Sequence, residues 1–319
     1  MENGTVLYIV VPCYNEEEVL PETATRLKEK LNRLAEEGKI APQSRVMFVN
    51  DGSKDRTWEL IGELHRSDPV FSGVDLSRNR GHQNALLAGL MTAKERCDAV
   101  ISMDADLQDD INAVDAMLEK FHAGCDVVYG VRSSRKKDSF FKRFTAEAFY
   151  RLMNFMGAET VFNHADYRLL SRRALEGLEQ FKEVNLFLRG IVPMIGYTSA
   201  TVEYERGVRF AGESKYPLKK MISFALEGIT SLSTRPIRYI TMLGFFVFLI
   251  SILMLIYSVV RWAMGETIIG WASVICSVWA IGGLILLSLG VIGEYIGKIY
   301  LETKERPRFL VREILDREK

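Results

Sequence analysis

Cysteine is scarce in this chain, and charge of neither sign is in excess. The four cysteines contain no C-x-x-C pair and no other paired spacing. A disulfide framework is therefore not expected, and the three cysteines of the charged region, Cys13, Cys97 and Cys125, suit a reducing compartment. Lysine and arginine together number 41, as do aspartate and glutamate, so no overall field favours a nucleic acid as a partner. Internal repeats and low-complexity segments are also lacking.

A secretory signal is missing from the start of the chain. The first residues, Met-Glu-Asn-Gly, have no basic region, and the apolar run at residues 6–11 is too short for a signal peptide. The charged region, residues 1–235, is typical of a globular domain. We therefore expect this domain to remain in the cytoplasm.

Two long apolar runs stand near the C-terminus, in residues 240–260 and 268–292, and neither contains a charged side chain. At a rise of about 1.5 Å per residue, each is long enough as a helix to cross a hydrocarbon core of about 30 Å. Two buried core helices are the alternative, but tandem runs with basic flanks are hard to bury in a soluble domain. The pattern favours a membrane hairpin.

Basic residues flank the two runs on their outer sides, and they are Arg235, Arg238, Lys298, Lys304, Arg306 and Arg308. The connection between the runs, residues 261–267, holds Arg261, whose charge is offset by Glu266. The positive-inside rule then places both ends of the chain in the cytoplasm and the hairpin turn outside. We expect a multi-pass membrane protein whose large domain faces the cytoplasm.

Apolar strands alternate with helical patterns through the first half of the chain. The expected strands are residues 7–11, 46–49, 70–76, 99–103 and 126–131. The expected helices are residues 16–37, 56–66 (with Asp55 as its cap), 81–94 and 111–122. This alternation predicts an α/β fold, a mostly parallel sheet covered by helices on both faces, with ligands at the carboxyl ends of the strands.

The pattern is looser in the second half of the chain. Residues 140–156 predict an amphipathic helix, and residues 198–205 predict an edge strand. Residues 218–232 mix charged and apolar side chains at helical spacing just before the first apolar run. This pattern favours an interfacial helix on the cytoplasmic leaflet, with a helix packed on the soluble core as the alternative.

An acidic motif, Asp104-Ala105-Asp106, follows the strand expected at residues 99–103. In an extended loop, side chains two residues apart point the same way, so Asp104, Asp106 and Gln108 would share one side. Their hard oxygen ligands suit Mg²⁺ or Mn²⁺ and leave positions open for phosphate oxygens. A D-x-D motif alone is common, and solvated acids would explain it too. Its place at a strand end among other polar loops favours a metal site.

Two further polar loops are expected on the same edge of the sheet. Asn-Asp-Gly-Ser at residues 50–53 is either a simple turn or a set of hydrogen-bonding groups for a nucleobase or ribose. In the other loop, Tyr14 offers an aromatic face, and Asn15 and Glu16 offer polar contacts. Together with the acidic motif, these loops indicate a nucleotide whose diphosphate reaches the metal.

Four motifs at these strand ends resemble those of the family 2 glycosyltransferases with a GT-A fold. They are Val-Pro-Cys-Tyr-Asn-Glu at 11–16, Val-Asn-Asp-Gly-Ser at 49–53, Ser-Arg-Asn-Arg-Gly at 77–81 and Met-Asp-Ala-Asp-Leu-Gln-Asp at 103–109. Within this family the chain is similar to the polyisoprenyl-phosphate branch, which holds bactoprenol glucosyltransferases and dolichyl-phosphate mannose synthase. The motifs stand in the same order, and the two apolar runs near the C-terminus match the bacterial members of this branch. With the two later segments described next, the resemblance covers nearly the whole chain.

Two later segments also resemble that branch. They are His-Ala-Asp-Tyr-Arg-Leu at 164–169 and Gly-Glu-Ser-Lys-Tyr at 212–216. The departure from the family pattern is Asn50, where aspartate is frequent, but Asp51 still supplies a carboxylate. The resemblance implies a Rossmann-like GT-A domain at 1–210, interfacial helices at 211–238, a transmembrane hairpin at 239–293 and a cytosolic tail at 294–319.

The resemblance also implies the site residues. The nucleotide pocket would contain Pro12, Tyr14, Asn15, Glu16, Asp51 and Asp104. The metal, Mg²⁺ or Mn²⁺, would be held by Asp104, Asp106 and Gln108. The catalytic set would be Asp106, Arg132, Asp166 and Lys215, and the acceptor phosphate would be held by Arg132, Ser214 and Lys215. As alternatives, Arg132 is a surface cation and Lys215 contacts the membrane surface.

The implied reaction is inverting transfer of a hexose from a nucleotide sugar to polyprenyl phosphate, in bacteria undecaprenyl phosphate, at the cytoplasmic face of the inner membrane. The bactoprenol resemblance favours UDP-glucose or UDP-N-acetylglucosamine as the donor, with a product used to modify cell-envelope glycans. Because a phosphate monoester is mostly anionic near neutral pH, Asp166 either positions a substrate, acts as a base or orients Arg168. Paired anchors are also compatible with a homo-oligomer.

Two other functions fit part of the pattern. A membrane-anchored synthase that extends a polysaccharide would share the nucleotide motifs, but it would carry Q-x-x-R-W, and the only Arg-Trp pair here is Arg261-Trp262 in the expected outer turn. A catalytically silent nucleotide-sugar binder would have no need of Asp104, Asp106 and Lys215. We therefore expect an enzyme.

Overall fold

The computed structural model describes residues 4–133, 164–205, 207, 230, 233–265 and 270–316. The chain forms two compact units. One contains a β-sheet with its flanking helices and includes the end of the chain from Arg306 onward. The other contains the two long apolar helices.

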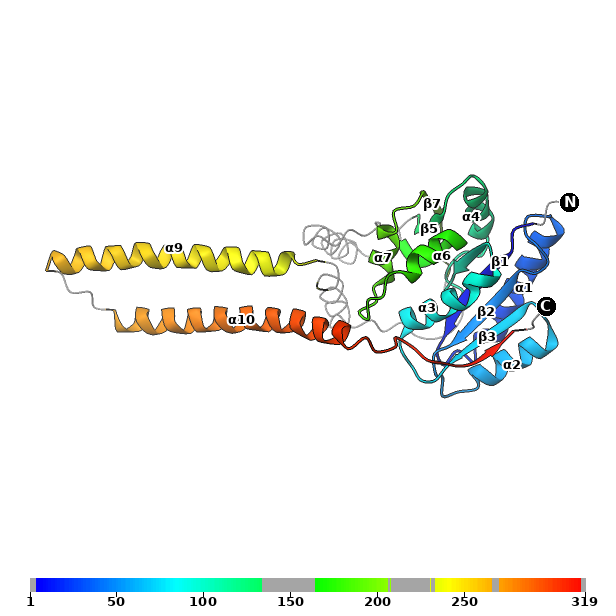
Figure 1. Ribbon diagram of the computed structural model, residues 1–319, viewed down its shortest axis with the longest axis horizontal. Helices are drawn as coiled ribbons and strands as arrows, with labels where there is room; N and C mark the ends of the chain where they lie inside the picture. Colours follow the sequence, from blue (N-terminus) through cyan, green and yellow to red (C-terminus); the bar gives the residue numbers. More distant parts are fainter. Residues whose placement is uncertain are drawn as a thin grey trace. The chain divides into compact units, whose positions relative to one another are not determined.

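In the described residues, eight strands form one sheet in the order β7-β5-β6-β4-β1-β2-β3-β8 (Figure 1). Their bounds are β1 Leu7–Cys13, β2 Arg45–Asn50, β3 Phe71–Leu76, β4 Ala99–Ser102, β5 Val127–Arg132, β6 His164–Ser171, β7 Ser199–Tyr204 and β8 Val311–Leu315. β1 pairs in parallel with β2 and β4, β2 with β3, and β5 with β7. β6 is antiparallel to both β4 and β5, and β8 is antiparallel to β3. The mostly parallel sheet of the expected GT-A fold is confirmed.

Helices cover both faces of this sheet because both faces of its central strands are apolar. The helices are α1 Leu20–Glu36, α2 Thr57–Ser67, α3 His82–Ala93, α4 Ala113–His122, α6 Arg172–Glu179 and α7 Leu188–Met194. On β1, Leu7, Ile9 and Val11 belong to the core under α1 and α4. Tyr8 and Val10 belong to the core under α3, α6 and α7. The alternation follows from the two-residue period of a strand.

The helices expected in the first half are confirmed, with shifts at their ends. α1 begins at Leu20 and not at residue 16, because residues 16–19 form a turn in which the N–H of Val19 donates to the carbonyl of Glu16 at 3.1 Å. α2 begins at Thr57. Asp55 accepts hydrogen bonds from the Thr57 N–H at 3.1 Å and the Thr57 hydroxyl at 2.6 Å. The N-cap residue is Arg56, which makes no side-chain capping bond, so the cap expected at Asp55 is wrong by one residue.

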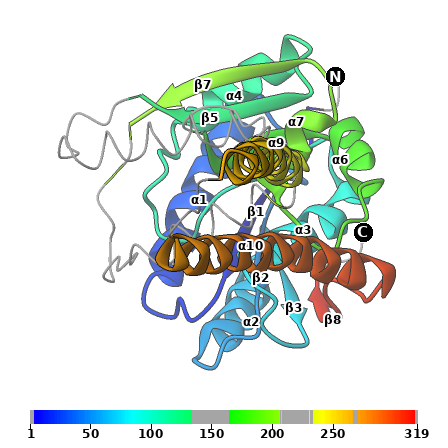
Figure 2. The same cartoon turned by 90° about the vertical axis from the view of Figure 1, so that its left-hand side faces the viewer.

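Two strands have no counterpart among the expected elements. β6 contains the motif at residues 164–169, and β8 belongs to the expected tail and lies beside β3 at the sheet edge (Figure 2). Both carry charged side chains in mid-strand, so hydrophobic periodicity does not mark them. The edge strand expected at residues 198–205 is confirmed as β7.

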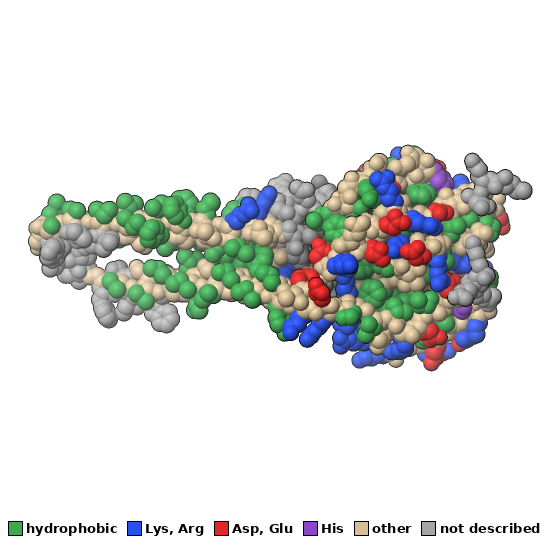
Figure 3. Space-filling view, in the orientation of Figure 1, with side chains coloured by type: hydrophobic (Ala, Val, Ile, Leu, Met, Phe, Trp, Pro, Cys, Tyr) green, Lys and Arg blue, Asp and Glu red, His purple; other side chains and the backbone are tan. Residues whose placement is uncertain are grey.

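The second unit contains α9 (Arg235–Ala263) and α10 (Trp271–Thr303), which follow the two apolar runs. The windows Arg235–Met254 and Ala280–Thr303 are long and apolar enough to cross a membrane, by length and composition. Hydrophobic side chains lie along the described parts of both helices (Figure 3).

α10 extends past the expected end at residue 292 and includes the charged residues Glu294 and Lys298. The helices expected at residues 140–156 and 218–232 lie outside the described residues, apart from Thr230.

Candidate active site

The expected polar loops lie along one edge of the sheet because they follow neighbouring parallel strands. The register pairs Cys13 of β1 with Asn50 of β2, and Asn50 with Asp75 of β3. On the other side of β1, Ser102 of β4 pairs with Val10, and the acidic motif follows directly. Since all four strands run the same way, their carboxyl ends meet at this edge.

Reciprocal hydrogen bonds join the loop after β1 to the loop after β2. The N–H of Asn15 donates to Ser53 Oγ at 3.0 Å, and the N–H of Lys54 donates to Asn15 Oδ1 at 2.8 Å. The N–H of Glu16 donates to Thr57 Oγ1 at 2.9 Å. Asn15 has a φ of 55°, a left-handed conformation that asparagine tolerates better than most residues. The two loops therefore form one ordered structure.

Two other predicted nucleotide contacts differ in their exposure. Pro12 is buried within β1, whereas 43% of Tyr14 is exposed at the rim of these loops. The ring of Tyr14 is therefore accessible to a ligand, and the nucleotide contacts expected of Pro12 and Tyr14 remain predictions.

Asp51 is buried and binds a neighbouring loop. Its carboxylate accepts hydrogen bonds from the N–H groups of Arg80 at 2.6 Å and Gly81 at 2.9 Å. Burial raises the pKa of Asp51, although these two hydrogen bonds oppose the rise. The contact joins the loop at residues 77–81 to that at residues 50–53, which the sequence alone did not indicate. The nucleotide contact expected of Asp51 remains a prediction.

Gly52 shows how closely these two loops approach. It has a φ of +66°, and a Cβ atom at this position would lie 2.5 Å from the backbone nitrogen of Asn79. A side chain would therefore push the loops apart as well as strain the backbone.

The acidic motif forms a turn, so the expectation of an extended loop is wrong. Residues 105–107 form the turn, in which Leu107 has a φ of 57°. Asp106 Oδ1 accepts a hydrogen bond from the N–H of Gln108 at 3.1 Å, which bends the chain. The alternation argument therefore does not place Asp104, Asp106 and Gln108 on one side, and their joint role as metal ligands remains a prediction.

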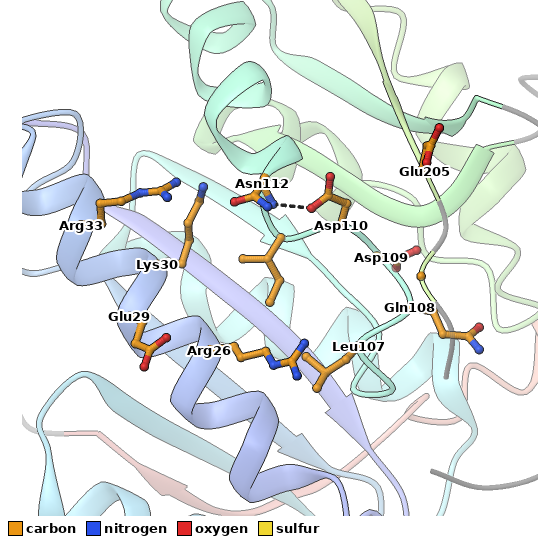
Figure 4. A pocket seen from close by; sticks show the side chains of 12 residues that line it. Arg26, Glu29, Lys30, Arg33, Leu107, Gln108, Asp109, Asp110, Asn112 and Glu205 are labelled. Carbon is orange, nitrogen blue, oxygen red and sulfur yellow. Dashed lines mark hydrogen bonds between the residues drawn. The ribbon is translucent and has the colours of Figure 1, made fainter. Parts of the chain in front are cut away.

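Gln108 lines a pocket of about 540 Å³ between α1 and the start of α4 (Figure 4). The wall on the α1 side includes Arg26, Lys30 and Arg33, and neither Asp104 nor Asp106 contributes to the lining. The sequence did not predict this pocket.

Asp104 lies among other charged groups. His82 Nε2, at the start of α3, is 3.5 Å from Asp104 Oδ1 and 3.9 Å from Asp166 Oδ2. Burial raises the pKa of Asp104, and the negative charges of Asp166 and Asp106 raise it further against the influence of His82. Within the described part of the chain, no three His, Cys, Asp or Glu side chains are grouped as a metal site.

Asp166, at the start of β6, is held between two arginines. Arg168 Nη2 donates to Asp166 Oδ1 at 2.5 Å, and Arg189 Nη2 donates to Asp166 Oδ2 at 3.0 Å. Burial alone would raise the pKa of Asp166, but the two guanidinium groups outweigh it and hold the pKa well below its usual range. Arg189 comes from α7, and no local pattern in the sequence marked it.

Arg132, at the end of β5, belongs to a cluster around a buried acid. Its Nε donates to the Tyr204 hydroxyl at 3.3 Å, and its Nη2 lies 4.0 Å from Asp109 Oδ1. The Tyr204 hydroxyl donates to the same Asp109 oxygen at 2.5 Å. Burial and the charge of Asp104 raise the pKa of Asp109 to about 6, against the opposing effects of Tyr204 and Arg132. Asp109 is the last residue of the motif at 103–109, to which the sequence analysis assigns no role of its own, and the sequence did not indicate Tyr204. The other predicted phosphate ligands, Ser214 and Lys215, lie outside the described residues.

The comparisons with known proteins agree with this architecture. The family model for glycosyl transferase family 2 matches residues 8–178. The uncharacterized glycosyltransferase YkoT of Bacillus subtilis (strain 168) is 56% identical over 310 residues, which cover 97% of this chain and 92% of that protein. Bactoprenol glucosyl transferase of Shigella phage SfX is 43% identical over 309 residues, which cover 95% of this chain and 98% of that protein.

A solved structure is also similar. It is glucosyl-3-phosphoglycerate synthase from Mycobacterium tuberculosis in complex with Mn²⁺, UDP and phosphoglyceric acid, with a TM-score of 0.46 and 16% sequence identity over 73% of this chain and 78% of that chain. The family match runs from β1 into α6 and includes the acidic turn and Asp166. With two relatives of more than 40% identity over nearly all of its length, the chain belongs to glycosyltransferase family 2.

Proposed function

We propose that this protein transfers a hexose, with inversion, from a nucleotide sugar to a polyprenyl phosphate at the cytoplasmic face of a bacterial inner membrane. The observation that carries the proposal is the 43% identity to a bactoprenol glucosyl transferase over 95% of this chain. A similarity of this extent includes the loops at the sheet edge and the apolar helices. UDP-glucose or UDP-N-acetylglucosamine is the proposed donor, and undecaprenyl phosphate is the proposed acceptor.

The nucleotide of the donor would lie against the loops that follow β1 and β2. The exposed ring of Tyr14 can stack on a base, while Asn15 and Glu16 flank it in the same loop. The hydrogen bonds between the two loops support this role because an ordered site loses less conformational entropy when it binds a ligand. Asp51 would contribute by holding the next loop in place.

The acidic turn suits Mg²⁺ or Mn²⁺ on the grounds of charge and ligand type. The pKa of Asp104 is raised by burial and by two neighbouring carboxylates, and the positive charge of a bound dication would favour its ionised form. Asp104 and Asp106 would hold the ion, with Gln108 as the third proposed ligand. When bound, it would supply Lewis-acid stabilisation of the charge on the leaving diphosphate.

The acceptor phosphate needs little activation. Its second pKa is about 6, so it is mostly anionic near neutral pH. One phosphate oxygen attacks the anomeric carbon, the bond from that carbon to the donor diphosphate breaks, and the nucleoside diphosphate leaves with the electron pair. Arg132, together with Ser214 and Lys215, would bind the acceptor phosphate through charge-assisted hydrogen bonds.

Asp166 acts in this proposal as a positioning group. Its lowered pKa keeps the carboxylate ionised and makes it a weak base at neutral pH. Its contact with Arg189 would aim that partly exposed guanidinium toward phosphate oxygens. The reaction then relies on placement and charge, as expected where the nucleophile is already anionic.

The two apolar helices would keep this site at the bilayer that holds the acceptor. Residues 239–293 form the proposed transmembrane hairpin, and the basic residues outside it would remain in the cytoplasm. Anchoring restricts the search for a lipid substrate to two dimensions and fixes its approach.

A transfer assay on the purified, detergent-solubilised full chain tests the proposal. It contains undecaprenyl phosphate, Mg²⁺ or Mn²⁺, and a panel of UDP- and GDP-sugars, with the lipid product identified by mass spectrometry. A metal-dependent lipid-phospho-sugar from a UDP-hexose is the expected result. UDP binding without product from any donor would overturn the proposal in favour of a silent binder.

A further inference from the structure

The end of the chain returns from the apolar helices to the sheet that carries the site. β8 (Val311–Leu315) pairs antiparallel with β3 (Figures 1 and 2). The N–H of Ser77 also donates to the carbonyl of Leu310 at 2.9 Å. Ser77 begins the loop whose Arg80 and Gly81 N–H groups bind Asp51. The tail therefore lies directly beside the loops of the proposed donor site.

A register shift in this strand pair directs one arginine toward β3. Asp75 pairs with Glu313 and the next residue, Leu76, pairs with Val311, so Arg312 is the extra residue of a bulge. Bulges re-aim side chains in this way. Arg312 Nη1 lies 3.0 Å from Asp75 Oδ2, and its Nη2 donates to the Ser77 carbonyl at 2.9 Å.

Asp75 links Arg312 to the predicted nucleotide loops. Its side chain is 1% exposed, and its Oδ1 accepts a hydrogen bond from Asn50 Nδ2 at 2.7 Å. Asn50 Oδ1 accepts from the N–H of Ser53 at 3.1 Å, and Ser53 Oγ accepts from the N–H of Asn15 at 3.0 Å. A continuous line of polar contacts thus runs from the tail to the loop that presents Tyr14.

We infer that Arg312 is a positioning residue for the nucleotide donor. The Asp75 carboxylate is buried, and the Arg312 guanidinium is the cation that the tail places beside it. The Asp75 carboxylate in turn orients the Asn50 amide, which fixes Ser53 and Asn15. The inference rests on the proposed function because it takes the ligand of these loops to be a nucleoside diphosphate.

A second ion pair of the tail provides a matched control. Arg96 forms an ion pair with Asp316, the residue after β8, and this pair also ties the tail to the domain. No contact described for Arg96 reaches the loops at residues 50–53 or 77–81. Loss of either arginine weakens the docking of β8, but loss of Arg312 alone interrupts the line of contacts.

The test compares Arg312→Gln, Arg312→Lys and Arg96→Gln in the detergent-solubilised full chain. UDP affinity is measured by calorimetry, and donor KM and kcat by the transfer assay. We expect R312Q to weaken UDP binding and raise donor KM by about tenfold, with kcat changed by less than about threefold. R312K should lose less UDP affinity than R312Q because it keeps the charge that faces Asp75, although it cannot also reproduce the second contact with the Ser77 carbonyl. R96Q should bind UDP normally.

The same R312Q change made in an Asp75→Asn variant tests whether Arg312 acts through Asp75. Without the buried charge, the further change R312Q should weaken UDP binding by less than about threefold, because the two residues act through one contact. Equal losses of UDP affinity in R312Q and R96Q, or a fall in kcat with donor KM unchanged, would overturn the inference.

The proposed function is judged separately by the unmodified chain. UDP binding without transfer there would refute the function, whereas the affinities of the variants would still decide the role of Arg312. A chain that binds no nucleoside diphosphate would overturn both.

Discussion

Asp166 and Arg168 form an ion pair from two positions of the same strand, with Arg168 Nη2 2.5 Å from Asp166 Oδ1. Residues two apart on a strand share a face, which explains why the Asp-x-Arg spacing brings these groups together. The Arg168 side chain is 1% exposed, so its charge depends on this partner. Arg189 completes the arrangement from α7.

Asp166→Asn tests the role of this pair in turnover. We expect transfer to fall by about 100-fold or more, because the variant loses the charge that places Arg189, while the dissociation constant of UDP changes little. Single-turnover kinetics and UDP titration measure the two effects. A strong loss of UDP affinity would contradict the assignment, and thermal unfolding of the variant controls for damage to the fold.

Gly52→Ala tests the close approach of the two donor-side loops. We expect weaker UDP binding and a loss of stability of about 1–3 kcal/mol, because the new Cβ would meet the backbone of Asn79 in an already left-handed conformation. Gly38→Ala is the matched control, since Gly38 has a similar φ of +70° but no atom within 4 Å of its Cβ position. If both variants bind UDP equally, the contact between the loops does not matter for the ligand.

Asp115→Asn tests a pH-dependent part of the stability. Asp115 pairs with Lys30, whose side chain is 3% exposed, and with Lys39. Burial raises the pKa of Asp115, but the hydrogen bonds and charges of these lysines outweigh it and lower the pKa. The stabilisation is therefore fully present above the unfolded-state pKa of about 4 and is lost as the pH falls through the lower folded-state pKa.

At neutral pH this variant should lose about 3 kcal/mol, the lower limit for a broken buried pair, because 24% of the Asp115 side chain is exposed. Denaturant unfolding at several pH values checks this, and the difference from the original chain should shrink below about pH 4. Glu22→Gln, which breaks an exposed pair with Arg26, should change stability by less than about 1 kcal/mol. A difference that does not vary with pH would contradict the assigned pairing.

Removal of the apolar helices should have two separable effects. A chain that ends at Arg235 loses β8 as well as α9 and α10, so it should bind UDP more weakly than the full chain. An internal deletion that joins residue 234 to residue 306 through a flexible linker keeps β8 and should retain UDP affinity, while it transfers poorly to long-chain lipid. Full lipid transfer by this deletion variant would remove the proposed role of the anchors.

Metal removal should abolish transfer if the acidic turn holds the ion. We expect a chelator to stop the reaction, Mg²⁺ or Mn²⁺ to restore it, and Asp104→Asn to lower transfer by at least about 100-fold at saturating metal. Asp110→Asn, in the same loop, serves as a control outside the proposed ligand set. Transfer that continues in the chelator would exclude the metal from the mechanism.

The order of strands and helices up to residue 132 follows from the sequence, because each central strand is a short apolar run and each helix has one apolar stripe. The same reasoning places the polar loops at one edge, since parallel strands point their carboxyl ends the same way. It fails at β6 and β8, where charged residues such as Arg168 and Arg312 interrupt the pattern. It also fails at the acidic turn, where the hydrogen bond to Asp106 overrides the extended geometry.

The sequence by itself determined the family, the acidic motif and the two apolar helices, because these depend on residue type, order and local spacing. Only the tertiary structure decided which distant residues share a contact. Arg189 reaches Asp166 because α7 packs against the sheet, and Arg312 reaches Asp75 because a bulge in β8 turns it toward β3. Such pairings are set by strand order and register, which long-range packing fixes and no local pattern records.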